Sequence, residues 1–398
     1  MRRIAVVGAS GFVGSTVVER LLAQAQDEVR PLIHSSGNAW RLARLGLELQ
    51  TLDLLVQDDI DVALRGCTHV VNCALGSTEA MLTGLHNLLV ASRKQHVERF
   101  IHLSSVLVYG DPPPPESVHE TARTAPARGT YGWLKLQQDR MVQQACRAGL
   151  PSVILCPPNI SGPYSPFLVR VLEAVRAGAL GLVDDGKALC NLVDVANLAQ
   201  AINLALDRGS AAGQRMFITD DADTTWRDVV EGLSPVAAGV DPLPVITHEE
   251  LARLRLADSP PPHSLVHSLK HLVSSEVRTA LRQDPLWAKV EQALGQGVAR
   301  LGTGVVERVR ASLAGPPPIP RVHHDPRYDA SLCLQQLRGV RHACDLARQE
   351  LGYKPLYTFA ASMRAFCAWY RCQHGMETGS WALLKQLYKH GEPYHHGL

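Results

Sequence analysis

The stretch Ile4-Ala-Val-Val-Gly8-Ala-Ser-Gly11-Phe-Val-Gly14-Ser-Thr16 decides the fold that we expect for this chain. Four apolar residues in a row are typical of a strand that is buried on both faces, as in the centre of a parallel sheet. A glycine-rich turn follows at once, and the apolar residues after it recur with the period of a helix. A glycine turn between a buried strand and a helix predicts a dinucleotide-binding site.

Each glycine of this turn has a separate expected role. Gly8 permits a tight turn, Gly11 lets the backbone approach a pyrophosphate, and Gly14 lets the helix pack closely on the strand. The helix that begins here offers unpaired N–H groups and a partial positive charge to the phosphates. We therefore expect the cofactor to contact the glycines and the residues between them, Ser10, Phe12 and Val13.

Length and composition limit the classes of protein to which this chain can belong. A chain of 398 residues is longer than one hydrophobic core usually supports, so we expect two domains or one domain with large insertions. Its apolar fraction of 46% and net charge of +2 are ordinary for a globular protein and give no electrostatic case for nucleic-acid binding. The nine cysteines are scattered, which predicts a reducing compartment and no metal site. Without a signal peptide or an apolar membrane span, we expect a cytoplasmic protein.

Strand-like and helix-like segments alternate after the glycine turn, which predicts an α/β fold with a doubly wound, Rossmann-type parallel sheet. We assign residues 1–160 to this cofactor-binding domain, with contributions from about 185–220, and residues 161–398 to a smaller, mostly helical substrate lobe. A helix is expected at about 78–95. The further expected strands are residues 28–34, 47–54, 68–75, 99–105 and 151–156.

The end of the second expected strand bears on the choice of cofactor. An NAD site usually has an acidic residue there to bind the ribose 2′-hydroxyl, but this strand ends at His34. The basic residues Arg41 and Arg44 follow, which favours a 2′-phosphate and therefore NADP. The alternative is that both arginines are solvated helix surface and the cofactor is NAD.

Further cofactor contacts are expected where other strands end. Asp53, with Leu54 beside it, follows the third strand, where an adenine amino group could be met. Ala74 ends the fourth strand and is small enough for a nicotinamide ribose to approach the backbone. Pro158 follows the last of these strands.

Three residues have the chemistry for hydride transfer between a nicotinamide and a carbonyl or an alcohol. Tyr131 and Lys135 are four residues apart and so share one face of a helix, one turn apart. The tyrosine would exchange a proton with the substrate oxygen, and the lysine ammonium would lower its pKa from about 10. Ser105, at the end of the fifth strand, would donate a hydrogen bond to the same oxygen.

At these residues the sequence resembles the extended short-chain dehydrogenase/reductase family, also called the NAD-dependent epimerase/dehydratase family. The resemblance covers about residues 1–219 and resumes at 347–355. It is carried by GASGFVG, Asp53-Leu54, the run from Phe100 to Gly110, YGWLK, and the segment from Pro157 to Pro163. It implies an NAD(P)-dependent enzyme with Ser105, Tyr131 and Lys135 as its catalytic residues and Asn159 as a substrate contact.

Departures from the family pattern bear on the substrate. The helix motif that usually carries a relay asparagine is here the run from Met81 to Leu85. Two arginines that clamp nucleotide phosphates are replaced by Cys156 and, near the second position, Cys190. Losing both anchors argues against a nucleotide-sugar substrate.

We therefore expect interconversion of a carbonyl and an alcohol on a non-nucleotide, lipophilic small molecule. The alternatives are a sugar-nucleotide epimerase or dehydratase that holds its NAD throughout the cycle, and a non-catalytic dinucleotide-binding scaffold or sensor. A helical insertion at about 243–320 contains an amphipathic stripe over 286–313. This stripe would serve as a lid or as a subunit contact in a homodimer, or would dock peripherally on a membrane.

Overall fold

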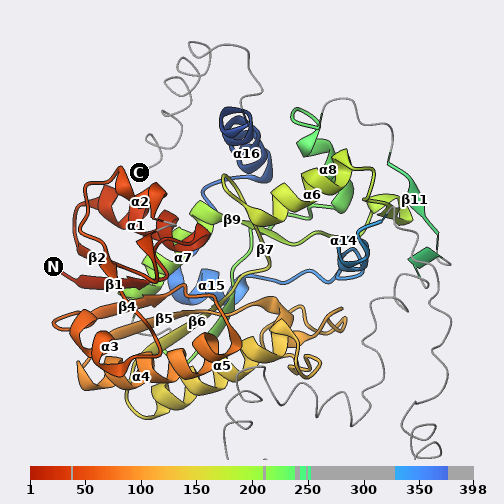
Figure 1. Cartoon of the computed structure of the whole chain (residues 1–398). Coiled ribbons are helices and arrows are strands. Elements are labelled where there is room, and N and C mark those ends of the chain that lie inside the picture. The colour runs from red at the N-terminus through yellow and green to blue at the C-terminus, as the bar shows by residue number, and fades with distance from the viewer. Residues whose placement is uncertain (37–38, 209–211, 238–242, 248–249, 252–327, 375–398) are drawn as a thin grey trace, which may run out of the picture. The chain divides into compact units, whose positions relative to one another are not determined.

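The computed structural model describes residues 1–36, 39–208, 212–237, 243–247, 250–251 and 328–374. The chain divides into two compact units, residues 1–247 with 327–398, and residues 248–326. The elements below belong to the first unit (Figure 1). The expected amphipathic stripe over 286–313 lies outside the described residues.

A seven-stranded parallel sheet forms the centre of this unit, which confirms the predicted Rossmann-type fold. In the strand order β10-β6-β5-β4-β1-β2-β3, the strand before the glycine turn is an interior strand, paired with β4 on one side and β2 on the other. The strands are β1 (Arg3–Val7), β2 (Glu28–Ile33), β3 (Gln50–Thr51), β4 (His69–Asn72), β5 (Arg99–Leu103), β6 (Ser152–Cys156) and β10 (Arg215–Phe217).

Helices cover both faces of the sheet because successive residues of β1 point to opposite sides. Ile4 and Val6 belong to one apolar core, and Ala5 and Val7 belong to the other. The first core is closed by α1 (Phe12–Gln24), α7 (Val195–Asp207) and α15 (Asp345–Leu351). The second is closed by α3 (Gln57–Ala63), α4 (Leu85–Lys94) and α5 (Tyr131–Arg147), seen below the sheet in Figure 1.

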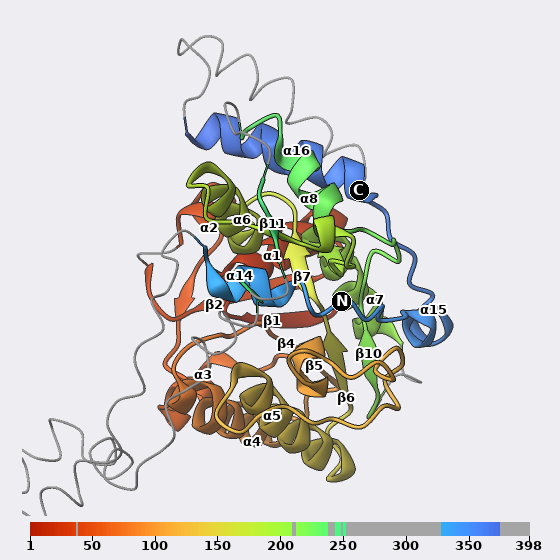
Figure 2. The same ribbon diagram turned by 90° about the vertical axis from the view of Figure 1, so that its right-hand side faces the viewer.

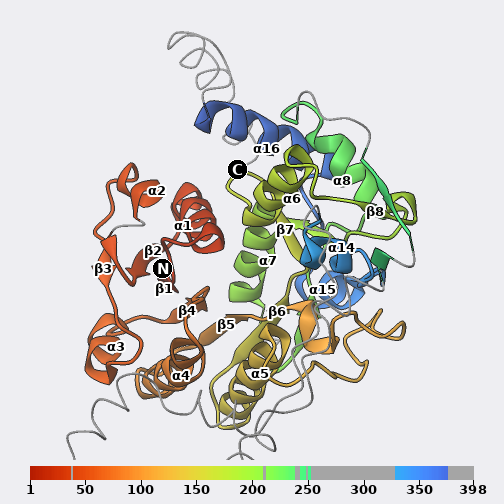
Figure 3. The same ribbon diagram turned by 45° about the vertical axis from the view of Figure 1, so that its right-hand side comes forward.

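A second group of elements has its own apolar core, which includes Leu172, Trp226 and Phe366. Its helices gather on one side of the sheet in Figures 2 and 3. They are α6 (Pro166–Arg176), α8 (Trp226–Leu233), α14 (Ala330–Gln335) and α16 (Phe359–Gln373). Two small parallel sheets belong to the same group, β7 (Asn159–Ser161) with β9 (Leu192–Asp194), and β8 (Leu182–Val183) with β11 (Val245–Ile246).

Two expected elements differ in the structure. The strand expected over 47–54 is reduced to β3, and a turn follows it in which Asp53 Oδ1 accepts a hydrogen bond from Leu55 N. The helix expected over 78–95 begins with a π-helical turn, η2 (Ala80–Gly84), before α4. A Cβ on Gly84 would lie 2.8 Å from the Cβ of Leu54, so glycine lets this turn pack against the neighbouring loop.

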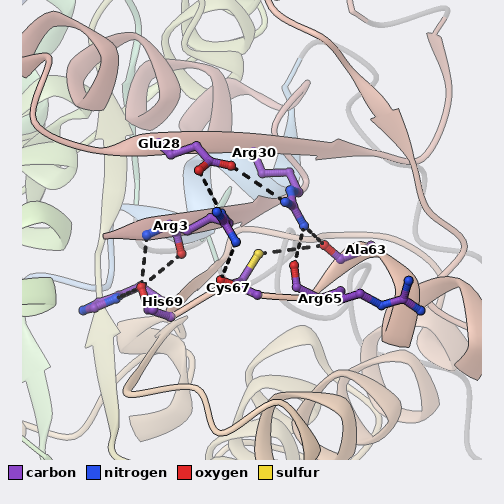
Figure 4. A network of polar contacts seen from close by, with 9 residues as sticks. Arg3, Glu28, Arg30, Ala63, Arg65, Cys67 and His69 are labelled. Atoms are coloured by element: carbon purple, nitrogen blue, oxygen red, sulfur yellow. Dashed lines mark hydrogen bonds and ion pairs between the residues drawn. The ribbon is translucent and has the colours of Figure 1, made fainter. Parts of the chain in front are cut away.

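The amino ends of the central strands carry a polar network (Figure 4). Arg3 Nε on β1 donates to Glu28 Oε2 on β2 at 2.8 Å. Arg30 donates to the carbonyl oxygens of Ala63 and Arg65, at 2.8 and 3.0 Å. We call these residues the amino-end network. It joins β1 and β2 to the loop before β4, at the edge opposite the glycine turn.

Within the described ranges, no helix combines the length and the apolar character that crossing a membrane requires.

Candidate active site

A cleft of about 1260 Å³ opens at the carboxyl ends of the central strands. Every sequence-predicted site residue except Gly14 lines it, although the residues come from strand ends, loops and one helix. Those that line it are Gly8, Ser10, Gly11, Phe12, Val13, His34, Arg41, Asp53, Leu54, Ala74, Ser105, Tyr131, Lys135, Pro158 and Asn159.

The glycine turn has the geometry expected of a phosphate cradle. Gly8 adopts a positive φ of 77°, and a Cβ there would lie 2.9 Å from the backbone of Ala74. A Cβ on Gly14 would lie 2.2 Å from Gly8 O, so Gly14 acts by letting α1 pack against the turn. Gly11 precedes α1 and supplies no side-chain cap, which leaves the helix N-terminus free to bind an anion.

Tyr131 reaches the cleft because α5 begins at this residue. Thr130 caps the helix by accepting a hydrogen bond from Trp133 N at 3.3 Å. A Cβ on Gly132 would lie only 2.2 Å from Leu107 O, so this glycine lets α5 pack closely on the 3₁₀ turn η3 (Val106–Tyr109). Ser105 is the N-cap of that turn, and its Oγ accepts from Leu107 N at 3.2 Å. The contact between α5 and η3 therefore brings Tyr131 and Ser105 to the same cleft.

Lys135 lies one turn further along α5 and is 4% exposed. Its Nζ lies 5.8 Å from the centre of the Tyr131 ring and donates to Leu103 O at 2.9 Å, at the end of β5. The backbone carbonyl fixes the ammonium at the floor of the cleft. Two of its protons remain for other acceptors there.

The expected lowering of the tyrosine pKa is not produced by the protein groups. Tyr131 is 41% exposed to the cleft, but desolvation by the surrounding walls still raises its pKa to about 12, and the nearby Asp139 carboxylate adds to this rise. Burial also lowers the pKa of Lys135 to about 8. Desolvation disfavours the charged form of each group, so both shifts favour the neutral forms in the chain without cofactor. The expectation that Lys135, together with an oxidised nicotinamide, favours the tyrosinate stays a prediction.

Sequence reasoning missed a buried polar network behind Lys135. Asp139 is fully buried on the next turn of α5 and accepts from Arg215 Nε, on β10, at 3.0 Å. His102 Nε2 lies 3.9 Å from Asp139 Oδ1, and His102 Nδ1 lies 3.2 Å from Asn72 Nδ2. Burial holds the pKa of His102 well below its usual value, so this imidazole is neutral. An aspartate four residues after Lys135, on the same helix face, was the available signal.

Arg41 lines the cleft as a buried guanidinium that is paired with an acidic residue. It is 8% exposed and donates to Glu19 Oε2 at 3.3 Å, with its guanidinium 4.1 Å from the centre of the Tyr164 ring. Arg44 pairs with the same carboxylate at 2.7 Å, but its side chain is 64% exposed. The alternative that both arginines are solvated surface is therefore wrong for Arg41. The end of the cleft near β2 carries a guanidinium whose charge is shared with Glu19.

The other half of the cleft is lined mainly by apolar and aromatic side chains. Asn159 Nδ2 there donates to Cys190 Sγ at 3.9 Å. Burial raises the pKa of the Cys190 thiol to about 12, so this position is uncharged. Sequence reasoning did not identify most of the residues lining this half, which come from six segments of the chain. They include Leu107, Phe167, Leu189, Trp226, Gln335, Arg338, His342 and Trp369.

The sequence is similar to those of known proteins. The sequence model of the NAD dependent epimerase/dehydratase family matches residues 4–218. The chain is 28% identical over 237 residues to the 4-hydroxy-2-methyl-3-oxo-4-farnesyl-3,4-dihydroquinoline-1-oxide ketoreductase of Stigmatella aurantiaca, covering 56% of this chain and 70% of that protein. It is 26% identical over 252 residues to dTDP-glucose 4,6-dehydratase 1 of Escherichia coli K12, covering 52% and 70%.

A solved structure extends the likeness in fold beyond the residues that the family model matches. It is dTDP-glucose 4,6-dehydratase from Bacillus anthracis in complex with NAD, with a TM-score of 0.62 and 16% identity. The match covers 93% of this chain and 97% of the other. At this identity the likeness shows the fold alone.

Proposed function

Because the chain belongs to the NAD-dependent epimerase/dehydratase family, we propose that it reduces a ketone on a non-nucleotide, lipophilic small molecule with NAD(P)H. Membership makes it an enzyme of the short-chain dehydrogenase/reductase or epimerase/dehydratase type, so the alternative of a non-catalytic scaffold falls away. The observation that carries the proposal is a single cleft that combines the glycine cradle, Ser105, Tyr131, Lys135 and an apolar substrate half.

The residues of the cleft fit a dinucleotide. The positive φ of Gly8 and the uncapped start of α1 suit a pyrophosphate, and Asp53 offers a carboxylate to an adenine amino group. Lys135 Nζ retains donors for ribose hydroxyls beside its bond to Leu103 O. When bound, the reduced nicotinamide would supply the hydride.

Each catalytic residue then has one task. Ser105 donates a hydrogen bond to the substrate carbonyl oxygen and orients it. Tyr131 gives its phenolic proton to that oxygen as negative charge develops. The phenol form of Tyr131 suits reduction, because the ketone oxygen must gain a proton, whereas alcohol oxidation would require the tyrosinate. Lys135 places a positive charge beneath the ring.

Two features support a lipophilic substrate over a sugar nucleotide. The positions of Cys156 and Cys190, where the resemblance leads us to expect phosphate-binding arginines, are fully buried thiols. The same half of the cleft is lined by Phe167 and Trp226, whose rings make an edge contact with centroids 5.8 Å apart. Apolar walls bind an apolar substrate, and the two thiols offer a diphosphate no bidentate partner.

For the cofactor we propose NADP(H) over NAD(H). No acidic residue stands at His34, Ser35 or Ser36, and Arg41 lines the cleft beside them. Glu19 shares the charge of Arg41, so the preference should be modest. Calorimetric titration with both cofactors tests this, and tighter binding of NAD(H) would contradict it. Glu19→Gln should strengthen NADP(H) binding and leave NAD(H) binding unchanged.

The activity is tested by screening ketones while following the absorbance of the reduced nicotinamide. The screen should contain farnesylated and alkyl ketones and, as the competing class, dTDP-glucose and UDP-glucose. Turnover of a lipophilic ketone that is lost in Tyr131→Phe supports the proposal. Conversion of a sugar nucleotide without net cofactor consumption would instead establish the epimerase or dehydratase alternative, which the similarity to dTDP-glucose 4,6-dehydratase keeps open.

A further inference from the structure

Arg338 enters the substrate half of the cleft from a segment far along the chain. This segment, residues 336–342, is fixed at several points. Gln336 Nε2 donates to Gly181 O at 2.7 Å, and His342 Nδ1 lies 2.8 Å from Ser117 O. Asn191 Nδ2 donates to Val340 O at 2.6 Å. The backbone that carries Arg338 is therefore anchored by hydrogen bonds on both sides of this residue. Arg338 lines the cleft together with Cys190 and Asn159.

One edge of the Arg338 guanidinium is already engaged. Nε donates to Asp111 Oδ1 at 2.6 Å, and Nη2 donates to Asp111 Oδ2. The side chains are 21% and 47% exposed. A guanidinium has five N–H groups, of which this paired geometry uses two. In the part of the chain that the structure describes, Nη1 has no acceptor, so donors remain for a ligand.

The pairing also decides which acceptor is favoured. Together Arg338 and Asp111 carry no net charge, and a second anion would meet the repulsion of Asp111 as well as the attraction of Arg338. A neutral carbonyl oxygen can accept a charge-assisted hydrogen bond from the guanidinium without that repulsion. The walls around it, including Leu107 and Leu189, suit the apolar remainder of such a molecule.

We propose that Arg338, neutralised by Asp111, binds a second, uncharged oxygen acceptor of the substrate, such as an ester or a further ketone. This rests on the proposed function, and it narrows the substrate class to lipophilic ketones with a neutral carbonyl group elsewhere in the molecule. Arg338 then selects such compounds against carboxylates and diphosphates.

The test measures binding as well as turnover, using the full chain saturated with NADP. The probes are ethyl 3-oxohexanoate and the 3-oxohexanoate anion, titrated by calorimetry. The wild type should bind the ester about tenfold more tightly than the acid, because the anion also meets the repulsion of Asp111. Arg338→Met should weaken ester binding about tenfold. Asp111→Asn should strengthen acid binding by a similar factor and remove the preference.

A matched control is available in the same lobe. Arg170 makes a comparable two-bond pair with Asp329, at 3.0 and 2.8 Å, and neither residue lines the cleft. Arg170→Met should therefore leave both dissociation constants unchanged. A structural role of Arg338 alone would lower the unfolding midpoint without altering the ratio of ester to acid binding.

Failure of this proposal is distinguishable from failure of the proposed function. Unchanged ester affinity in Arg338→Met, equal affinity of the wild type for the two probes, or no binding of either probe would overturn the role of Arg338. Expected affinities with no reduction of the bound ester would leave that role standing and overturn the reductase. Tyr131→Phe should abolish reduction and leave both dissociation constants unchanged.

Discussion

Charged residues differ in burial between the amino ends and the carboxyl ends of the central strands. At the amino ends, Arg3 and Glu28 form a pair whose side chains are 40% and 41% exposed, in contact with solvent (Figure 4). At the carboxyl ends, Lys135 is 4% exposed and Asp139 is fully buried. Solvent screens the first set, so its charges cost little and contribute little. The second set lies where desolvation shifts pKa values, which is where chemistry can be tuned.

This contrast follows from the parallel arrangement of the strands. All carboxyl ends meet at one edge, where the loops diverge to leave the cleft. The amino ends receive the chain from the helices through short loops, and Arg30 donates to carbonyl oxygens at the end of α3 and in the loop that follows it. We therefore expect substitutions at the carboxyl ends of the strands to alter the catalytic rate and its pH dependence. Substitutions in the amino-end network should leave both unchanged.

The largest expected effect belongs to Tyr131→Phe. The variant keeps the ring but removes the proton donor, so the rate should fall by roughly two to four orders of magnitude. Cofactor affinity should change little. Steady-state kinetics on a ketone found in the screen measures the first, and titration measures the second. Tyr370→Phe removes a hydroxyl that pairs with Arg176 outside the cleft, and it should leave the rate unchanged. Near-normal turnover by Tyr131→Phe would refute the assigned mechanism.

Ser105→Ala should follow, with a loss of about two orders of magnitude, because one donor to the developing oxyanion is removed. Its neighbour supplies the control. Ser104 also lines the cleft, but it is expected to make no bond to substrate, so Ser104→Ala should cost less than about tenfold. A reversed order of these two variants, measured as the catalytic rate under saturating substrate, would reassign the serine.

Asp139→Asn should move the pH profile as well as the stability. The Asp139 charge raises the pKa of Tyr131, so its removal should shift the alkaline limb of ketone reduction to lower pH. Loss of the buried pair with Arg215 should also destabilise the fold by about 3–5 kcal/mol, because it leaves a buried guanidinium unpaired. Rate against pH and denaturant unfolding measure the two effects. A limb that stays in place in a folded variant would show that Asp139 has a structural role only.

The smallest effect is expected for Glu28→Gln in the amino-end network. The pair that it breaks is half exposed, so the catalytic rate should stay within about twofold of the wild type. The unfolding midpoint should decrease slightly, and less at high salt, because salt screens exposed charges. A loss of activity comparable to that of Asp139→Asn would contradict the expected difference between the amino-end network and the carboxyl ends of the strands.

Much of the fold followed from local patterns. The buried run before Gly8 and the glycine spacing predicted β1, the turn and α1, and the structure has them at those residues. The alternating segments predicted the parallel sheet, although β3 is only two residues long. Edge strands are hard to delimit from sequence because a side-chain bond, here from Leu55 N to Asp53, can end them.

By itself the sequence determined what depends on neighbours along the chain. The register of Tyr131 and Lys135 is a property of helix geometry, and the positive φ of Gly8 is a property of glycine. Only the tertiary structure decided whether the pKa of Tyr131 is raised or lowered, and which charges lie in the substrate half of the cleft. Asp139 pairs with Arg215, 76 residues away, and Arg338 pairs with Asp111, 227 residues away. Burial and distant charges set these properties, and neither exists until the chain has folded.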